Sequence, residues 1–401
     1  MRKSFYLLKE SETNYLESID TASIISLGDE ELELLRNCNE EVINFLSENR
    51  ILSIKKDEIN EYCAMILVND FCNLKCSYCF EKDNCKSHNE LTDKTYELIS
   101  NRLKEFNDIT FTGGEPLLSF DVIKKICELI SSKRLNGKYS LITNGLIFTD
   151  EQLRFLNENE FNIQISLDGS ISKDNNKLDR TNRKIENKIL ENIRLILTNY
   201  QNIKLDLRIN FCKSDLVDFE NKLDSLFAFL EPYLDKISID LKLVDLPYGD
   251  KEYLSFVEKH DVYIKFYDYL YKKGIELPFR FVSGGYCMAR GPKTLLLDPL
   301  GNRYPCFSFV ENEEFKISLE NTNFFEQLKD CEKECILHDI CNVGCLYENY
   351  CDTGKLINQC DFELLDDLNK RLFLYKLREL KYIQTSIEEE VQHVEAFSIN
   401  I

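Results

Sequence analysis

The chain has 401 residues, 43% of them hydrophobic, which suffices for one large domain or two to three smaller ones. Its formal net charge of −20 at pH 7 argues against a nucleic-acid partner, whose phosphates require local positive charge. No apolar run is long enough to span a bilayer and the N-terminus lacks a signal-peptide pattern, so we expect a cytoplasmic protein with no membrane partner.

Residues 1–60 are predicted to form a small α+β module. The segments "SFYLLKE" and "TASIISL" have the composition of strands. The segments "DEELELLRNC" and "NEEVINFLSENRI" are amphipathic, with acidic residues in their first turns, and favour helices. Such a module either docks a peptide or caps the main domain, and the sequence leaves both interpretations open.

Residues 61–245 alternate between apolar strand-like segments and charged segments with helical periodicity. The predicted strands are 63–69, 108–113, 139–144, 161–168, 203–211 and 236–244. Repeated strand–helix units predict an α/β fold with a parallel sheet, either open or a partial barrel. Ligands of such sheets bind beyond the carboxyl ends of the strands. We therefore expect the segments that follow the first four strands, "FCNLKCSYCF", "GGEP", "TNG" and "SLDG", to gather on one rim.

The remaining chain divides into three predicted parts. Residues 246–286 form a linking helical segment, 287–365 hold a second group of cysteines, and 366–401 supply a C-terminal helix and an acidic tail. The chain has 16 cysteines, three of them within 72–79 and eight within 287–360. In a reducing cytosol clustered cysteines more often hold metal than form disulfides.

The first group, "CNLKCSYC", places Cys72, Cys76 and Cys79 in a C-x3-C-x2-C spacing. Three thiolates on a four-iron cubane leave one iron with an exchangeable position, as a catalytic site requires. The alternative is a zinc site completed by Cys85 or His88. In "TGGEP" (112–116), the paired glycines permit close approach to the backbone, and Glu115 supplies a carboxylate for a cationic amine.

These two motifs together resemble the radical S-adenosylmethionine (SAM) superfamily over residues 63–245. The resemblance implies a partial six-unit (β/α) barrel and reductive cleavage of SAM to a 5′-deoxyadenosyl radical. It implies a cluster held by Cys72, Cys76 and Cys79, with Tyr78 against the adenine. It also implies SAM contacts from Gly113, Gly114 and Glu115 to the amine, and from Asn144, Ser166 and Arg180 to the ribose and carboxylate.

The second group of cysteines resembles the SPASM extension that follows some radical SAM barrels. Its spacing departs from that family once, because three residues instead of two separate Cys331 from Cys335. By this resemblance two auxiliary clusters bring the total to three 4Fe–4S clusters. The distal one would take Cys331, Cys335, Cys341 and Cys360, and the proximal one Cys287, Cys306 and Cys345.

The proximal set lacks one expected ligand. Full-ligand members of the family carry a further cysteine about six residues before the first, and here that place is near Phe281. Either one iron is open to a substrate thiolate, or Cys351 closes the cluster, or Cys351 is only structural. The sequence leaves these alternatives open.

These resemblances leave three possible functions. The first is a maturase that builds a thioether or another cross-link in a ribosomally made precursor peptide. A cysteine-rich precursor is one expectation, and ferredoxin or flavodoxin is the expected electron donor. The second is an anaerobic sulfatase-maturing enzyme, which generates formylglycine. The third is a non-catalytic Fe–S or zinc binding module, which would leave "GGEP" unexplained. The sequence identifies neither the substrate nor the bond formed, nor the oligomeric state.

Overall fold

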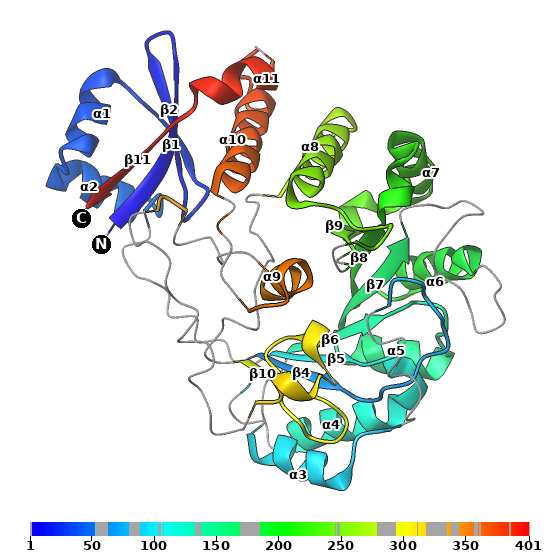
Figure 1. Ribbon diagram of the computed structural model, residues 1–401. Coiled ribbons are helices and arrows are strands. Elements are labelled where there is room, and N and C mark those ends of the chain that lie inside the picture. The colour runs from blue at the N-terminus through cyan, green and yellow to red at the C-terminus, as the bar shows by residue number, and fades with distance from the viewer. Residues whose placement is uncertain are drawn as a thin grey trace. The chain divides into compact units, whose positions relative to one another are not determined.

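A computed structural model shows the chain as two compact units (Figure 1). One unit comprises Met1–Glu58, Ser255–Cys287 and Gln327–Ile401, and the other comprises Ile59–Leu254 and Met288–Glu326. The structure describes residues 2–52, 63–79, 89–102, 106, 108–132, 138–168, 185–244, 246, 249–278, 294–310, 312–317, 335–337, 345–356, 360, 362–384 and 386–400. Among these residues, no helix is long and apolar enough to cross a membrane.

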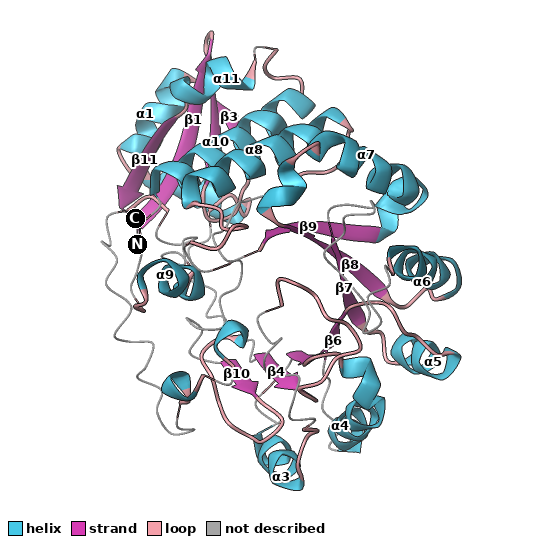
Figure 2. Ribbon diagram, turned by 45° about the vertical axis from the view of Figure 1, so that its right-hand side comes forward, coloured by secondary structure: helices cyan, strands magenta, loops and turns pink. Residues whose placement is uncertain are grey.

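The larger unit is built on a seven-stranded parallel sheet of order β10-β4-β5-β6-β7-β8-β9. All six predicted strands are confirmed, each within two residues of its expected ends. They are β4 (Cys63–Leu67), β5 (Asp108–Thr112), β6 (Lys138–Thr143), β7 (Asn162–Asp168), β8 (Lys204–Phe211) and β9 (Ile237–Leu243). Five helices follow these strands: α3 (Asp93–Arg102), α4 (Phe120–Ser132), α5 (Asp150–Glu158), α6 (Glu186–Asn199) and α7 (Phe219–Leu230). The helices lie along the outside of the sheet, as in a partial α/β barrel (Figure 2).

The seventh strand, β10 (Thr294–Leu297), was not expected. It returns from the cysteine-rich part of the chain and pairs in parallel with β4, so that Leu295 lies opposite Ala64. Its four residues are all buried and show no alternation, so periodicity alone does not distinguish them from a turn of buried helix. The confirmed barrel therefore carries one strand more than the six predicted.

Buried and half-buried residues alternate along the central strands, so the two faces of the sheet differ in polarity. On β7 the residues Ile163, Ile165 and Leu167 are buried, and Ile165 lies near Ile189 of α6. Each such side chain stabilises the fold by about 1.5–3 kcal/mol relative to an exposed one. The intervening positions of β7 are polar and half-buried or, at Asp168, buried. The apolar face thus packs against helices, and the polar face is the inner one.

The smaller unit contains an antiparallel sheet of order β11-β1-β2-β3. Its strands are β1 (Arg2–Glu10), β2 (Thr13–Ser18), β3 (Ile24–Leu27) and β11 (Glu395–Asn400), and two helices, α1 (Asp29–Arg36) and α2 (Glu40–Glu48), follow β3. The predicted strands and helices of residues 1–52 are confirmed, but β2 and β11 were missed. Ile399 of β11 joins the same buried cluster as Phe5 and Leu35, so the end of the chain completes the core of its beginning.

Within the described residues, this unit also contains the helices α8 (Phe256–Lys272), α9 (Leu346–Thr353), α10 (Phe362–Glu379) and α11 (Ile387–Glu390). Across the two units, short 3-10 turns occur at Pro116–Ser119, Lys213–Leu216, Glu231–Lys236, Phe307–Phe309, Glu313–Phe315 and Val391–His393. The long helices α8 and α10 correspond to the predicted linking and C-terminal helices.

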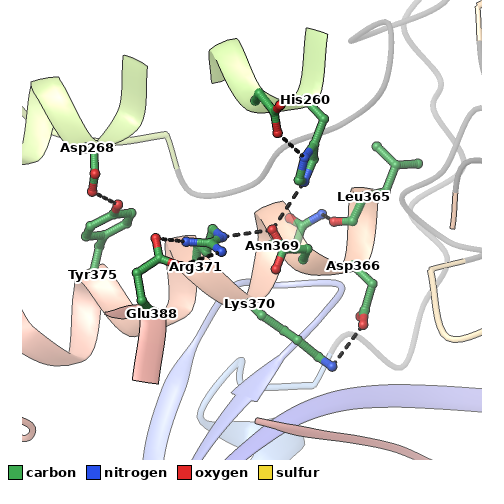
Figure 3. A network of polar contacts seen from close by, with 11 residues as sticks. His260, Asp268, Leu365, Asp366, Asn369, Lys370, Arg371, Tyr375 and Glu388 are labelled. Atoms are coloured by element: carbon green, nitrogen blue, oxygen red, sulfur yellow. Dashed lines mark hydrogen bonds and ion pairs between the residues drawn. The ribbon is translucent and has the colours of Figure 1, made fainter. Parts of the chain in front are cut away.

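A polar network joins α8, α10 and α11 (Figure 3). His260 Nε2 of α8 lies 3.1 Å from Asp367 Oδ2 of α10. Arg371 bonds both Asp367, at 2.8 Å, and Glu388 of α11, at 2.6 Å. Burial alone would raise the pKa of Asp367, but His260 and Arg371 together hold it below its ordinary value. The carboxylate therefore stays ionised and ties the helices of this unit together.

Candidate active site at the carboxyl rim of the sheet

The three cysteines of the first group lie directly beyond the carboxyl end of β4. Cys72 Sγ accepts a hydrogen bond from the Leu74 amide at 3.3 Å, and the Cys79 amide donates to the Cys76 carbonyl at 3.3 Å. All three side chains are half-buried. Within the described part of the chain no cysteine forms a disulfide. The loop thus presents three thiols at the rim where the sequence predicted them.

The donor set of this loop fits a four-iron cluster better than a single ion. Among the described residues no three His, Cys, Asp or Glu side chains converge on one ion position. A cubane binds each thiolate to a different iron, so its ligands need not meet at one point. Three thiols on a short loop suit that requirement. Cys72, Cys76 and Cys79 would hold the group, which is a proposal from the donor chemistry.

The two glycines of "TGGEP" lie against the segment that leads into the cysteine loop. A Cβ atom on Gly113 would come within 2.3 Å of the Asn69 carbonyl oxygen, and one on Gly114 within 2.3 Å of the Phe71 carbonyl oxygen. The Gly114 amide donates to Asn69 O at 3.2 Å and the Glu115 amide to Phe71 O at 2.9 Å. The close approach that we expected of a ligand is made here by the backbone of Asn69–Phe71. The glycines therefore fix the position of the cysteine loop.

Glu115 is 1% exposed and its carboxylate is used inside the protein. Its Oε1 accepts hydrogen bonds from the Leu117 amide at 3.1 Å and the Thr143 hydroxyl at 2.7 Å. Its Oε2 accepts from the Asn144 amide at 2.8 Å. These bonds join the turn after β5 to the loop after β6. A contact to the amine of SAM stays a prediction for this residue, and its visible role is to position Asn144.

The first experimental prediction concerns Glu115→Gln. One oxygen becomes an NH2 group, which cannot accept from the backbone amides of Leu117 or Asn144. A buried donor left without an acceptor costs about 1–3 kcal/mol. We expect SAM affinity to fall by roughly tenfold to a hundredfold. Equilibrium binding of SAM to the anaerobic protein measures this effect, and an unchanged affinity would remove Glu115 from the site.

Asn144 connects the loop after β6 to the cysteine loop. Its Nδ2 lies 2.8 Å from Asn73 Oδ1 and 3.7 Å from Cys72 Sγ. Its Oδ1 accepts from the Leu146 amide at 2.9 Å, which fixes the orientation of the side chain. The predicted gathering of "CNLKC", "GGEP" and "TNG" on one rim is therefore visible in hydrogen bonds.

Tyr78 spans from the cysteine loop to the strands β7 and β8. Its hydroxyl donates to Asp168 Oδ1 at 2.5 Å, and Asn210 Nδ2 donates to that hydroxyl at 3.4 Å. Burial raises the pKa of Tyr78 well above its usual range, and Asp168 raises it further. The phenol stays protonated and anchors the loop. The expected contact of Tyr78 with adenine stays a prediction.

The other predicted residues divide between those that the structure describes and those that it does not. Ser166 lies on the polar face of β7, opposite Arg208 of β8. Cys306 precedes a short 3-10 turn, Cys345 caps α9 and Cys351 lies within it. Cys335 is half-buried and Cys360 is exposed. Outside the described residues lie Arg180, Cys287, Cys331, Cys341 and the alternative zinc ligands Cys85 and His88.

Sequence reasoning missed four residues that organise this rim. They are Asn69, Thr143, Asp168 and Asn210. Each stands at the last or the next-to-last position of a predicted strand, and that position is the signal that would have found them. Asn69 Nδ2, for example, donates to the Glu115 carbonyl at 2.9 Å and so adds to the contact between the two loops.

Comparison with known proteins supports the interpretation of this rim as a cofactor site. Residues 66–209 match the radical SAM superfamily. The chain therefore contains a radical SAM domain, which implies a 4Fe–4S cluster and SAM as its cofactors. Bound at the cluster, SAM supplies a radical that can abstract hydrogen from a substrate.

Individual relatives extend the similarity beyond this domain. The cysteine-type anaerobic sulfatase-maturating enzyme of Clostridium novyi (strain NT) is 26% identical over 322 residues, which is 71% of this chain and 84% of that protein. The structure of anSMEcpe with bound AdoMet and the Cp18Cys peptide has a TM-score of 0.61 at 19% identity, covering 80% of this chain and 98% of that one. The structure of Streptococcus suis SuiB bound to precursor peptide SuiA has a TM-score of 0.56 at 15% identity, covering 89% and 98%. At these identities the two structures show a shared fold.

Proposed function

We propose that this protein is a radical SAM maturase that modifies a peptide or protein, and that its substrate is a ribosomally made precursor peptide. The observation that carries the proposal is the cysteine loop, which Gly113–Glu115 and Asn144 hold at the carboxyl rim of a radical SAM domain. The relatives give support for the substrate class. The anSMEcpe structure contains a peptide, and the SuiB structure contains a precursor peptide.

The finer proposal is a thioether cross-link between a substrate cysteine and a carbon of the same peptide. Its support is the sequence around the proximal auxiliary set, Cys287, Cys306 and Cys345, which has no cysteine near Phe281. In this proposal SPASM-type cysteines hold two further clusters, for a total of three. The cross-link would remove one hydrogen atom from carbon, one proton from the thiol and one electron, and an auxiliary Fe–S cluster would accept that electron. The product keeps its sulfur and is lighter by two hydrogen atoms.

The chain's own residues have three tasks in this proposal. Cys72, Cys76 and Cys79 hold the cluster at the rim, and the bonds of Glu115 fix the loop that follows β6. Tyr78, bonded to Asp168, closes the cysteine loop against β7. The module of residues 1–60 is proposed to hold a leader part of the peptide, separate from the part that is modified. Ferredoxin or flavodoxin is the proposed electron donor.

Sulfatase maturation is the second candidate, because a specific observation favours it. The similarity to the Clostridium novyi enzyme extends over 84% of that protein, well beyond the radical SAM domain. In that reaction a cysteine becomes formylglycine and loses its sulfur. The proposed absence of a fourth proximal ligand is the sequence feature that argues for the thioether instead.

The decisive experiment is mass spectrometry of the product. The anaerobically reconstituted enzyme is given SAM, a reductant, and either a cysteine-containing peptide encoded beside its gene or a sulfatase-derived cysteine peptide. A product that keeps its sulfur and lacks two hydrogens supports the thioether. Formylglycine would establish the alternative. The absence of 5′-deoxyadenosine under reduction would favour a non-catalytic binding module.

The second prediction tests Cys351, which lies within α9. If the proximal set is open, Cys351→Ala should keep the iron content of the parent, about twelve irons for three cubanes. Turnover should also survive. Iron analysis and the electron paramagnetic resonance spectrum of the reduced protein measure this. A changed proximal spectrum would identify Cys351 as a ligand, and the open-iron feature of the thioether proposal would be lost.

A further inference from the structure

The antiparallel sheet of the smaller unit has one edge that is only partly paired. Strand β11 pairs with β1 from Arg2 to Leu7, where Leu7 lies opposite Glu395. Strand β1 itself continues to Glu10 and pairs there with β2. A cavity of about 890 Å³ lies beside this end of β1, lined by β1, β2, α1 and the residues around the start of β11. Both ribbon views place α1 and β11 near β1 (Figures 1 and 2).

The charges that line this cavity do not cancel. Two cations are already paired, because Lys9 Nζ lies 2.7 Å from Asp29 Oδ1 and Arg36 lies 3.3 Å from Glu395 Oε2. Three further lining carboxylates, Glu10, Glu33 and Glu390, have no ion pair or side-chain hydrogen bond with any residue that the structure describes. The lining therefore keeps three negative charges for which the described protein supplies no partner.

A buried amide in the same lining also lacks a donor. Asn14 of β2 is 1% exposed, and its Nδ2 donates to Asp29 Oδ1 at 2.8 Å. That bond fixes the orientation of the amide, so Oδ1 remains an acceptor. No described group donates to this oxygen. A buried acceptor without a donor costs about 1–3 kcal/mol, and a ligand N–H group that reached this oxygen would remove that cost.

These features select one kind of ligand. The three open carboxylates and the buried Asn14 oxygen are all acceptors. The open donors of the lining, on Asn37 and His393, belong to exposed side chains. The lining therefore favours a group rich in donors and positive charge. A metal ion does not fit, because no three acidic, histidine or cysteine side chains of the described chain converge on one position. The volume of the cavity lies within the usual range for sites that bind organic ligands, and it can hold several amino-acid side chains. Lysine ammonium and arginine guanidinium groups meet both conditions.

We propose that this cavity binds a cationic segment, bearing arginine or lysine, of the peptide that the enzyme modifies. The proposal rests on the proposed function, since it takes the partner to be the substrate peptide. It places the docking site of the smaller unit between α1 and the open end of β1. A bound extended segment would also have the unpaired β1 edge available for backbone hydrogen bonds.

The test compares two triple variants of the full-length, anaerobically reconstituted enzyme. The first carries Glu10→Gln, Glu33→Gln and Glu390→Gln. The control carries Glu158→Gln, Glu220→Gln and Glu231→Gln, exposed positions of the larger unit. Each triple variant loses three negative charges. The probe is a fluorescein-labelled peptide of alternating glycine and arginine, and a peptide of alternating glycine and glutamate is its counterpart. Both are titrated at 0.15 M salt, where attraction between exposed charges more than about 8 Å apart is largely screened.

We expect the cavity variant to bind the arginine peptide about tenfold or more weakly than the parent, and the control variant to bind it within about twofold. The glutamate peptide should not bind. Equal weakening in both variants would mean that only net charge attracts the probe, and no binding to the parent would mean that the site does not exist. Either result overturns the proposal. Release of 5′-deoxyadenosine is measured on the same samples, so a failure of the proposed function is seen separately.

Discussion

Replacing Cys72, Cys76 and Cys79 together with alanine should abolish cleavage of SAM while iron remains in the C-terminal cysteine region. The three thiols are the only predicted ligands of the cluster at the rim, and alanine leaves iron nothing to bind there. The proposed auxiliary ligands are separate in sequence and stay intact. We expect 5′-deoxyadenosine to fall below detection by liquid chromatography, with iron per chain reduced by about one third.

The matched control for this variant is Cys63→Ala. Cys63 is a half-buried cysteine of β4, in the same unit and on the strand that leads into the loop. It should keep both its iron and its activity. Production of 5′-deoxyadenosine by the triple variant would disprove the ligand assignment. A loss of all iron would show instead that the three positions are needed for folding.

The sequence predicts the barrel well because its strands carry their own signal. Alternation of buried and half-buried residues, as in Asn162–Asp168, is visible without knowledge of any partner. Of the three missed strands, β2 pairs with its sequence neighbours β1 and β3, whereas β10 and β11 depend on partners far away in sequence. β10 pairs with β4, and β11 pairs with β1 across almost the whole chain. Segments of four to six residues carry too little periodicity to be assigned alone.

The candidate site shows the same division. The spacing of Cys72, Cys76 and Cys79 predicts their chemistry, since ligand type and number follow from the residues themselves. The hydrogen bonds of Glu115 to Thr143 and Asn144 could not be predicted, because they join loops that only the folded sheet brings together. The glycine pair was expected to face a ligand. Its neighbours in the structure are backbone atoms of Asn69 and Phe71.

That contact makes Gly114→Ala the most severe single substitution that we predict. The new Cβ atom would stand 2.3 Å from the Phe71 carbonyl oxygen and 2.9 Å from the Phe71 nitrogen. These are backbone atoms, so no side-chain rotation relieves the overlap, and the end of β5 must move away from the cysteine loop. The movement breaks the bonds from Gly114 N to Asn69 O and from Glu115 N to Phe71 O.

The expected cost combines two effects. Overpacking costs about 1–3 kcal/mol, and each lost hydrogen bond costs about 0.5–1.5 kcal/mol. We therefore expect the free energy of unfolding to fall by roughly 3–5 kcal/mol, measured by denaturant titration of the iron-free protein. SAM binding should be lost in the reconstituted variant, because the cysteine loop and the turn that carries Glu115 no longer meet.

Gly28→Ala is the control, since a Cβ atom there would meet only Glu31 Oε2, at 3.5 Å, and its φ of −73° suits alanine. Gly28 is the N-cap residue of α1. At such a position alanine lowers the free energy of unfolding by a few tenths of a kcal/mol to about 1 kcal/mol relative to glycine. SAM binding should be unchanged in this variant. Native stability together with native SAM affinity in Gly114→Ala would show that the Asn69–Phe71 backbone yields to the new methyl group. The glycine would then be required by something other than the approach of the cysteine loop.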